Sequence, residues 1–273
     1  MPRAYAKLKG VGGRLFADPH PSPDETSFQV DNTSSQYYQS PYYRLHQNDL
    51  QPVPKPRTPQ PRMDLGAVLS ADILGAIQAV VSIVGLYTNV LEGPGVISSQ
   101  SGKYPILDES QLDFLKAELQ RLAPARKAFQ RAVIVACHHP PASVDSNHGG
   151  STGLAADIDS AAQAAGFWPD AVLSGHAHLY QRFTRSVDGR EIPYVVAGSG
   201  GFAATAPIGG LPTAPVTVGE YTLVAPPIVD FGYLLVGVDM SGPTPLLTID
   251  FHDRTNAKVD DGITLDLAAG KIR

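Results

Sequence analysis

The sequence predicts an α/β fold in which two β-sheets pack together as a sandwich. Before residue 180, short apolar strand patterns alternate with helical patterns, as they do where crossover helices join parallel strands. After that point, strand patterns follow one another without helices and are separated by turns rich in Gly and Pro. We therefore expect an α/β sandwich whose second sheet is completed by hairpins.

The N-terminal segment is expected to lie outside this fold. Residues 1–64 hold nine prolines from Pro19 to Pro61, with Ser, Gln and tyrosine pairs between them, and they lack apolar periodicity. This composition predicts an extended or disordered arm. Residues 65–273 are expected to form the folded domain.

Four elements are predicted in the first half of this domain. Apolar residues at helical spacing, with Asp64 as N-cap, predict a helix over residues 65–81, and a β-branched run predicts a strand over residues 81–88. Asp108-Glu-Ser-Gln111 resembles a capping box, and the helix that it opens carries Leu112, Leu115, Leu119 and Leu122 on one face. Residues 131–137 form an apolar run that predicts a second buried strand.

The later elements are predicted on the same grounds. A helix is expected over residues 155–165, and strands are expected over residues 170–174 and 192–197. Residues 233–240 and 245–251 are expected to pair antiparallel, and residues 262–267 form one more weak strand. The order of these elements is that of the predicted sandwich.

Composition excludes several classes of protein. The net charge is −5 and no Lys/Arg cluster occurs, so a nucleic-acid partner is not expected. The single cysteine, Cys137, excludes an internal disulfide framework and a Cys-rich zinc module. Residues 1–15 lack an apolar h-region, so no signal peptide is predicted and the cytoplasm is the default localisation. The apolar core at residues 73–86 is 14 residues long, shorter than the ~20 of a membrane span.

Histidines follow two of the predicted strands. His138 and His139 end one strand, His176 and His178 end the next, and a glycine-rich turn over residues 198–201 ends another. Ligands gather at the carboxyl ends of strands in α/β folds, and imidazole is a common ligand of zinc, iron and similar metals. Two histidines at spacing i, i+2 in an extended segment point in different directions, which suits two neighbouring ions. The sequence thus predicts a metal site at these strand ends.

The same residues resemble a known family. Val135-Ala-Cys-His138-His-Pro140 resembles the V-x-x-H-x-P block of the calcineurin-like metallophosphoesterases, and Gly175-His-Ala-His178-Leu-Tyr-Gln-Arg182 resembles their G-H-x-H block. The extension through Arg182 is most similar to the purple acid phosphatase branch. The resemblance covers roughly residues 80–255. It implies a calcineurin-like αββα sandwich, with two mixed sheets flanked by helices.

The resemblance also implies an activity and its metal ligands. The family holds two metal ions about 3.5–4 Å apart, which clamp a phosphate ester and activate the attacking water. Carried over, His138 and His176 would bind one metal and His178 the other, with Fe, Zn or Mn as the expected metals. The substrate would be a phosphate ester of unspecified kind.

Three further residues have weaker expectations. His148 lies in the loop where related phosphatases place a histidine that contacts the phosphate or protonates the leaving group, and an exposed loop histidine is the alternative. His139 is expected to support the metal site or to face the phosphate rather than to bind a metal. Arg182 is expected to hold the turn through backbone carbonyls.

The earlier sequence blocks of the family are missing. No Gly-Asp or Gly-Asn dipeptide occurs, so neither G-D-x-x-D/Y nor G-N-H-D/E is present. Asp18-Pro-His20 and Asp250-Phe-His252 match D-x-H, but we interpret both as coincidences, the second as an ordinary half-exposed strand. We therefore expect the C-terminal part of a phosphoesterase domain, incomplete at its N-terminus, whose activity needs ligands from a missing N-terminal half.

Two other functions remain open at this point. The absent carboxylates favour a non-catalytic remnant or an interaction protein with the same fold. A different histidine-based metal hydrolase is the third alternative, but the H-x-H here lacks the trailing Asp-His of the metallo-β-lactamase pattern.

Overall fold

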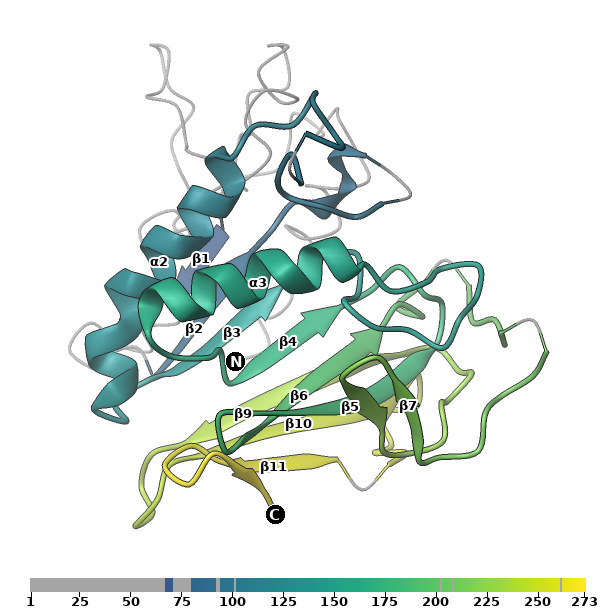
Figure 1. Ribbon diagram of the computed structural model, residues 1–273. Helices are drawn as coiled ribbons and strands as arrows, with labels where there is room; N and C mark the ends of the chain where they lie inside the picture. Colours follow the sequence, from purple (N-terminus) through teal and green to yellow (C-terminus); the bar gives the residue numbers. More distant parts are fainter. Residues whose placement is uncertain are drawn as a thin grey trace, which may run out of the picture.

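Three layers are stacked in the computed structural model, which describes residues 67–70, 80–91, 94–100, 102–201, 203–207, 209–260 and 262–273. Two helices cover one face of an eight-stranded sheet, and a four-stranded sheet lies against its other face (Figure 1). The prediction of a mixed α/β fold with two sheets is confirmed. Residues 1–64, for which an extended arm is predicted, lie outside the described residues.

The larger sheet is mixed and has the strand order β1-β2-β3-β4-β6-β5-β8-β7. Its central strands β2, β3, β4 and β6 are parallel, and the outer pairs are antiparallel. The strands are β1 (Ala67–Ser70), β2 (Val81–Gly85), β3 (Ala132–Ala136), β4 (Ala171–Ser174), β5 (Tyr180–Val187), β6 (Arg190–Ala197), β7 (Val216–Val218) and β8 (Tyr221–Leu223).

The smaller sheet is wholly antiparallel and has the order β12-β11-β10-β9. Its strands are β9 (Gly232–Asp239), β10 (Leu246–Asp253), β11 (Ile263–Asp266) and β12 (Lys271–Ile272). Along β10 buried and half-exposed residues alternate, so Leu247, Ile249 and Phe251 face the larger sheet. The predicted antiparallel pair and the predicted half-exposed strand are both confirmed.

Both faces of the larger sheet are buried, which explains why the sequence of β3 is continuously apolar. Val133 and Val135 pack into the core beneath the helices, whereas Ala132 and Ile134 pack into the core between the sheets. The helices are α2 (Ser110–Lys127) and α3 (Thr152–Ala165), and a 3₁₀ turn, η3, spans Thr88–Val90. The predicted leucine face of α2 is confirmed, because all four leucines are buried.

A buried network of charges closes the end of the sheet at which β4 begins. Asp170 is fully buried and accepts hydrogen bonds from Arg126 Nε (2.7 Å), from Val133 N (2.8 Å) and from Arg190 Nη2 (3.1 Å). Arg126 Nη2 also donates to Leu267 O (2.8 Å). The network therefore joins α2, β3, β6 and the turn after β11.

The helix predicted over residues 65–81 is wrong where the structure describes that range. Ala67–Ser70 forms β1 and pairs antiparallel with β2, and the predicted N-cap Asp64 and residues 71–79 lie outside the described residues. In an almost wholly apolar run, helical spacing does not separate a buried helix from a buried strand, and the pairing partner decides.

The predicted capping box is also wrong. Helix α2 begins at Ser110, whose N–H donates to Asp108 Oδ1 (3.0 Å) outside the helix. Gln111 does not reach back to the cap. It is buried and bonds the backbone of Tyr87, accepting from its N–H and donating to its carbonyl oxygen (3.0 Å). A tertiary contact to the loop after β2 replaces the local one.

The αββα expectation needs two corrections. No helix among the described residues covers the outer face of the smaller sheet, and that sheet is antiparallel rather than mixed. Strands β5, β7, β8 and β12 were not predicted. Within the described ranges, no helix has both the length and the apolar character that crossing a membrane would need. The apolar run at residues 73–86 lies partly outside those ranges.

Candidate metal centre

The site is built where two neighbouring parallel strands end. Strands β3 and β4 pair in register through Ala136 and Leu173, so the segments that follow them emerge side by side. The first delivers His138 and His139 and the second delivers His176. Gly175 N donates to His138 O (2.9 Å), which fixes one turn against the other.

The turn after β4, which carries His176, has an unusual backbone conformation. His176 has a φ of +64°, a left-handed conformation that a non-glycine residue seldom adopts. Gly198, after β6, lies directly against this turn, because a Cβ at that position would be 2.0 Å from Ala177 O. The left-handed residue lies at the centre of the histidine cluster, which is where strained backbone is often found in functional sites.

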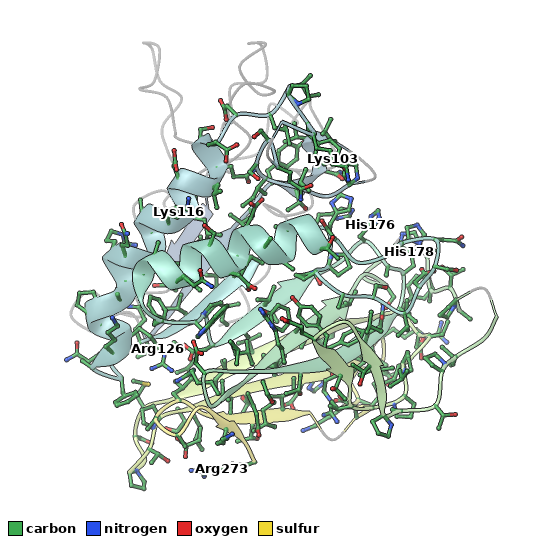
Figure 2. All side chains as sticks on the ribbon, in the orientation of Figure 1. Lys103, Lys116, Arg126, His176, His178 and Arg273 are labelled. Atoms are coloured by element: carbon green, nitrogen blue, oxygen red, sulfur yellow. The ribbon has the colours of Figure 1, made fainter. Side chains whose placement is uncertain are left out.

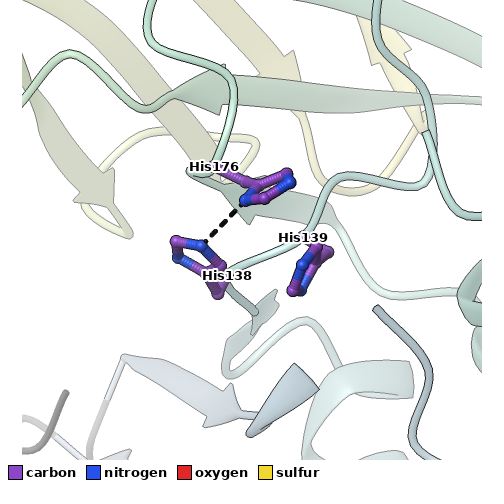
Figure 3. Close-up of side chains that lie close together, drawn as sticks. All are labelled: His138, His139 and His176. Carbon is purple, nitrogen blue, oxygen red and sulfur yellow. Dashed lines mark hydrogen bonds between the residues drawn. The ribbon is translucent and has the colours of Figure 1, made fainter. Parts of the chain in front are cut away.

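Five imidazoles form one contiguous cluster at this edge. His138 Nε2 and His176 Nδ1 are 3.0 Å apart, and the His139 ring centroid is 4.1 Å from that of His176 (Figure 3). His148 bridges to the remaining histidine, with ring centroids 4.9 Å from His176 and 4.8 Å from His178. His176 and His178 lie at the end of the sheet opposite Arg126 (Figure 2). The structure thus brings together all five histidines that the sequence singles out.

The loop after His139 is held in place by buried hydrogen bonds. Gln181 on β5 is fully buried, accepts from Val144 N (2.8 Å) and donates to Ser143 Oγ (3.0 Å). This loop carries Asp145, whose Oδ2 lies 2.9 Å from His148 Nδ1. The His148 side chain is 31% exposed, so His148 is an oriented, half-buried group and not a freely exposed loop histidine.

His139 is the most deeply buried member of the cluster. Its side chain is 1% exposed, and Thr88 Oγ1 accepts from its backbone N–H (2.9 Å) and lies 3.0 Å from its Nδ1. Gly95 presses on the ring, because a Cβ there would lie 2.4 Å from His139 Cγ. The other ring nitrogen, Nε2, has no hydrogen-bond partner among the described residues.

Burial and the neighbouring imidazoles lower the pKa of three rings of the cluster, those of His139, His176 and His178. Burial, followed by the neighbouring His176 and His138, lowers the pKa of His139 from 6.5 to about 3. Burial and then His138 likewise lower the pKa of His176, to about 4. The pKa of His178 is lowered by burial and by His148, against an opposing effect of Asp145. A neutral imidazole has a free lone pair, which is the state that binds metals.

The arrangement fits a transition metal. One ring nitrogen from each of His138, His139 and His176 lies within 4.8 Å of the others. This trio is the only such group of three among the described residues, and it contains no carboxylate. Burial raises the pKa of the adjacent Cys137 thiol to about 12, so the thiol stays protonated and donates to His139 O (3.1 Å).

Other sequence candidates lie elsewhere. Asp250 forms an ion pair with Lys258 (2.7 Å), and His252 Nδ1 lies 3.1 Å from Asn256 O, so each has a local role on β10. Asp18 and His20 lie outside the described residues. Arg182 contacts a backbone carbonyl, as expected, but this is Gly262 O near the smaller sheet rather than a carbonyl of its own turn.

Two residues of the site were missed from the sequence. Thr88 approaches from η3, 51 positions before His139, and no local pattern marks it. Asp145 precedes His148 by three positions, and an acid at that spacing in a loop is too common to be a signal on its own.

Comparisons with known proteins give only distant likenesses. Neither a protein-family model nor a curated protein sequence matches this chain. Similar solved structures include GAP50, the anchor in the inner membrane complex of Plasmodium (14% identity, TM-score 0.47, covering 76% of this chain and 55% of that one). They also include the purple acid phosphatase PPD1 from yellow lupin seeds (17%, 0.45, 68% and 30%) and PhoD (12%, 0.47, 83% and 47%). The chain spans about half or less of the length of these structures, and the likenesses are too weak to assign a family or a function.

Proposed function

We propose that this protein hydrolyses phosphate esters with the help of a transition metal held by the histidine cluster. The observation that carries the proposal is the convergence of five imidazoles and one carboxylate at the carboxyl edge of parallel strands. Ligand-binding clefts of α/β proteins form at this edge. The position of the histidines at this edge agrees with the roles that the two histidine blocks of the sequence imply.

The metal ligands would come from His138 and His176, with His178 the further ligand that the sequence pattern implies. The first two present ring nitrogens 3.0 Å apart, and burial keeps the His176 ring neutral. A cation bound there would lower the pKa of a coordinated water and offset negative charge on the phosphoryl oxygens.

His148 would exchange the proton of the leaving group. Its Nδ1 is engaged by Asp145, which fixes the orientation of the ring and leaves Nε2 as the nitrogen that can hold or pass a proton. The ring lies within 5 Å, centroid to centroid, of both His176 and His178, so it borders the place where a metal-held ester would lie. His139 would support the neighbouring rings from the protein interior.

Carboxylate ligands from outside the described residues would complete a two-metal site. The only metal-capable trio among the described residues is made of imidazoles alone, and a bridging carboxylate is needed to hold two ions at a fixed spacing. A missing N-terminal half is the partner that we propose for this purpose.

An activity assay tests the proposal. The chain, extended upstream by the proposed N-terminal half, is stripped with a chelator, reloaded with Zn²⁺, Mn²⁺ or Fe, and incubated with an aryl phosphate. We expect metal-dependent release of phosphate that falls at least 100-fold in His176→Ala and is unchanged in His252→Ala, a matched histidine outside the cluster. Equal rates in the wild type and His176→Ala would contradict the proposal.

The imidazole-only trio also favours a second candidate, a non-catalytic protein that binds metal without turnover. Without a carboxylate in the trio, the described residues have no group that would fix two ions at the catalytic spacing. This candidate predicts that the 273-residue chain binds metal but releases no phosphate. Any metal-dependent hydrolysis above the His176→Ala background rules it out.

A further inference from the structure

We propose that His138, His139 and His176 form a site for one tetrahedral ion of the zinc class, with His139 as the third ligand. The inference deepens the proposed function and rests on it for the presence of a metal. It differs in the number of ions and in the ligands that hold them. His139, which the sequence pattern places beside the metal, becomes a ligand, and His178 does not belong to this site.

The first two ligands already have the right spacing. Zinc binds imidazole nitrogen at about 2.0–2.1 Å, so two nitrogens on one tetrahedral ion lie about 3.3 Å apart. His138 Nε2 and His176 Nδ1 are 3.0 Å apart, and Figure 3 shows these two rings facing each other with His139 beside them. That spacing is a few tenths of an ångström short of the tetrahedral value, and the ion would lie to one side of the line that joins the two nitrogens.

His139 supplies an unsatisfied nitrogen to the same place. Its side chain is 1% exposed, and Nε2 has no hydrogen-bond partner among the described residues. Leaving a buried polar nitrogen unbonded is unfavourable, so such groups seldom persist without a function. One ring nitrogen from each of the three histidines lies within 4.8 Å of the others, and three ligands of one ion need to approach to about 3.3 Å.

Thr88 is placed to accept a hydrogen bond from His139 Nδ1, which is the tautomer that a metal on Nε2 requires. A metal on Nε2 leaves the ring proton on Nδ1, which lies 3.0 Å from Thr88 Oγ1. That oxygen also accepts from His139 N (2.9 Å), and its two lone pairs can receive both donors. Metal-bound histidines nearly always donate their second ring N–H in this way, to an oxygen that fixes the ring.

The remaining two histidines of the cluster, His148 and His178, are not part of this trio. His148 Nδ1 is paired with Asp145, and the ring of His178 packs on the ring of His148 with centroids 4.8 Å apart. Three imidazoles without a carboxylate favour Zn²⁺, Co²⁺, Ni²⁺ or Cu²⁺ over Mg²⁺ and Ca²⁺. Three protein ligands also leave the fourth position of a tetrahedral ion open to water or substrate.

Titration with Co²⁺, monitored by the visible absorption of the tetrahedral ion, tests this site without substrate. We expect the metal-free full chain to bind one equivalent with a tetrahedral spectrum. His139→Ala should weaken binding at least 100-fold and lose that spectrum, whereas the distant control His252→Ala should retain both. Two bound equivalents, or an unchanged spectrum and affinity in His139→Ala, would overturn the proposal.

A second variant covers the case in which His139→Ala does not fold. Thr88→Val keeps every ligand and removes only the oxygen that orients His139, so we expect binding about 10-fold weaker with an unchanged circular dichroism spectrum. Unchanged affinity would contradict the role given to His139.

Hydrolysis of an aryl phosphate by the same samples separates this inference from the proposed function. One bound equivalent in these samples, with no turnover even when the chain is extended upstream by the proposed N-terminal half, keeps the three-histidine site and removes the phosphatase. Wild-type turnover in His139→Ala keeps the phosphatase and removes the three-histidine site.

Discussion

The two ends of the central sheet treat buried polar groups in opposite ways. Where β4 begins, Asp170 is bonded to Arg126, Arg190 and the backbone of β3, so opposite charges pair around the buried carboxylate, and Arg190 Nε alone of these groups has no partner among the described residues. Where β4 ends, imidazoles crowd together, and His139 Nε2 is buried without a partner among the described residues. The first end is held together by pairs of opposite charge, and the second gathers groups of one kind, the imidazoles, whose remaining bonding capacity a metal ion would use.

The backbone shows the same contrast. At the histidine end, His176 adopts a left-handed conformation and Gly198 lies against the same turn with no room for a Cβ. Strain and tight approach of this kind cost folding free energy and are retained where they position functional groups. Stability should therefore depend mainly on the Asp170 end, and metal binding on the His176 end.

The largest effect on stability should come from breaking the buried network of charges. Asp170→Ala leaves Arg126 buried without its carboxylate, which we expect to cost about 3–5 kcal/mol of unfolding free energy. Chemical denaturation monitored by circular dichroism measures this change. Glu220→Ala is the control, because its ion pair with Arg185 involves a carboxylate that is 73% exposed and should contribute less than about 1 kcal/mol. Similar losses in the two variants would contradict the special role of the buried network.

A smaller effect is expected from crowding the histidine turn. In Gly198→Ala the new Cβ would meet Ala177 O at 2.0 Å, so the turn that carries His176 must shift. We expect a loss of about 1–3 kcal/mol and weaker metal binding, both measured by thermal unfolding with and without Zn²⁺. Gly201→Ala, in the same glycine-rich turn after β6 as Gly198, is the matched control, since its Cβ meets nothing within 4 Å. If Zn²⁺ stabilises Gly198→Ala as much as the wild type, the shape of the turn that carries His176 does not matter for metal binding, which would contradict this prediction.

The smallest effect should be confined to acid pH. The folded-state pKa of His139 lies near 3, below the 6.5 of the unfolded chain, so folding favours the neutral ring. Its contribution is fully present above pH 6.5 and is lost as the pH falls towards 3. In metal-free protein, His139→Gln should therefore lose less stability than the wild type between pH 7 and pH 5, by on the order of 1 kcal/mol. Parallel pH profiles of the melting temperature would contradict the burial of a neutral His139.

Much of the fold could be predicted because its strongest elements have local patterns. The leucine stripe of α2 and the apolar run of β3 specify their structures within the segment itself. Strand β5 has no such pattern. Its Gln181, Arg182 and Arg185 are polar in sequence yet buried, since their partners come from distant segments, such as Asp159 on α3. The polar residues of such a strand are buried by contacts with residues that are distant in the sequence. The sequence of the strand itself therefore does not reveal that it is a strand.

The residues of the site likewise fall into those that the sequence predicts and those that it does not. His138, His139, His176 and His178 follow predicted strands, and the parallel order of those strands is enough to bring them to one edge. Thr88 and Asp145 reach the site through the loop geometry around η3 and after His139, which depends on packing rather than on spacing. The sequence therefore predicts the ligand types, while their orientation and the orphaned His139 nitrogen become visible only in the folded chain.

The most direct test is anomalous diffraction at the zinc absorption edge, from crystals of the full chain grown with one equivalent of Zn²⁺. We predict a single anomalous peak about 2.0–2.1 Å from ring nitrogens of His138, His139 and His176. A peak elsewhere, two peaks of equal height, or no peak at the end of β3 and β4 would contradict a metal centre of this kind.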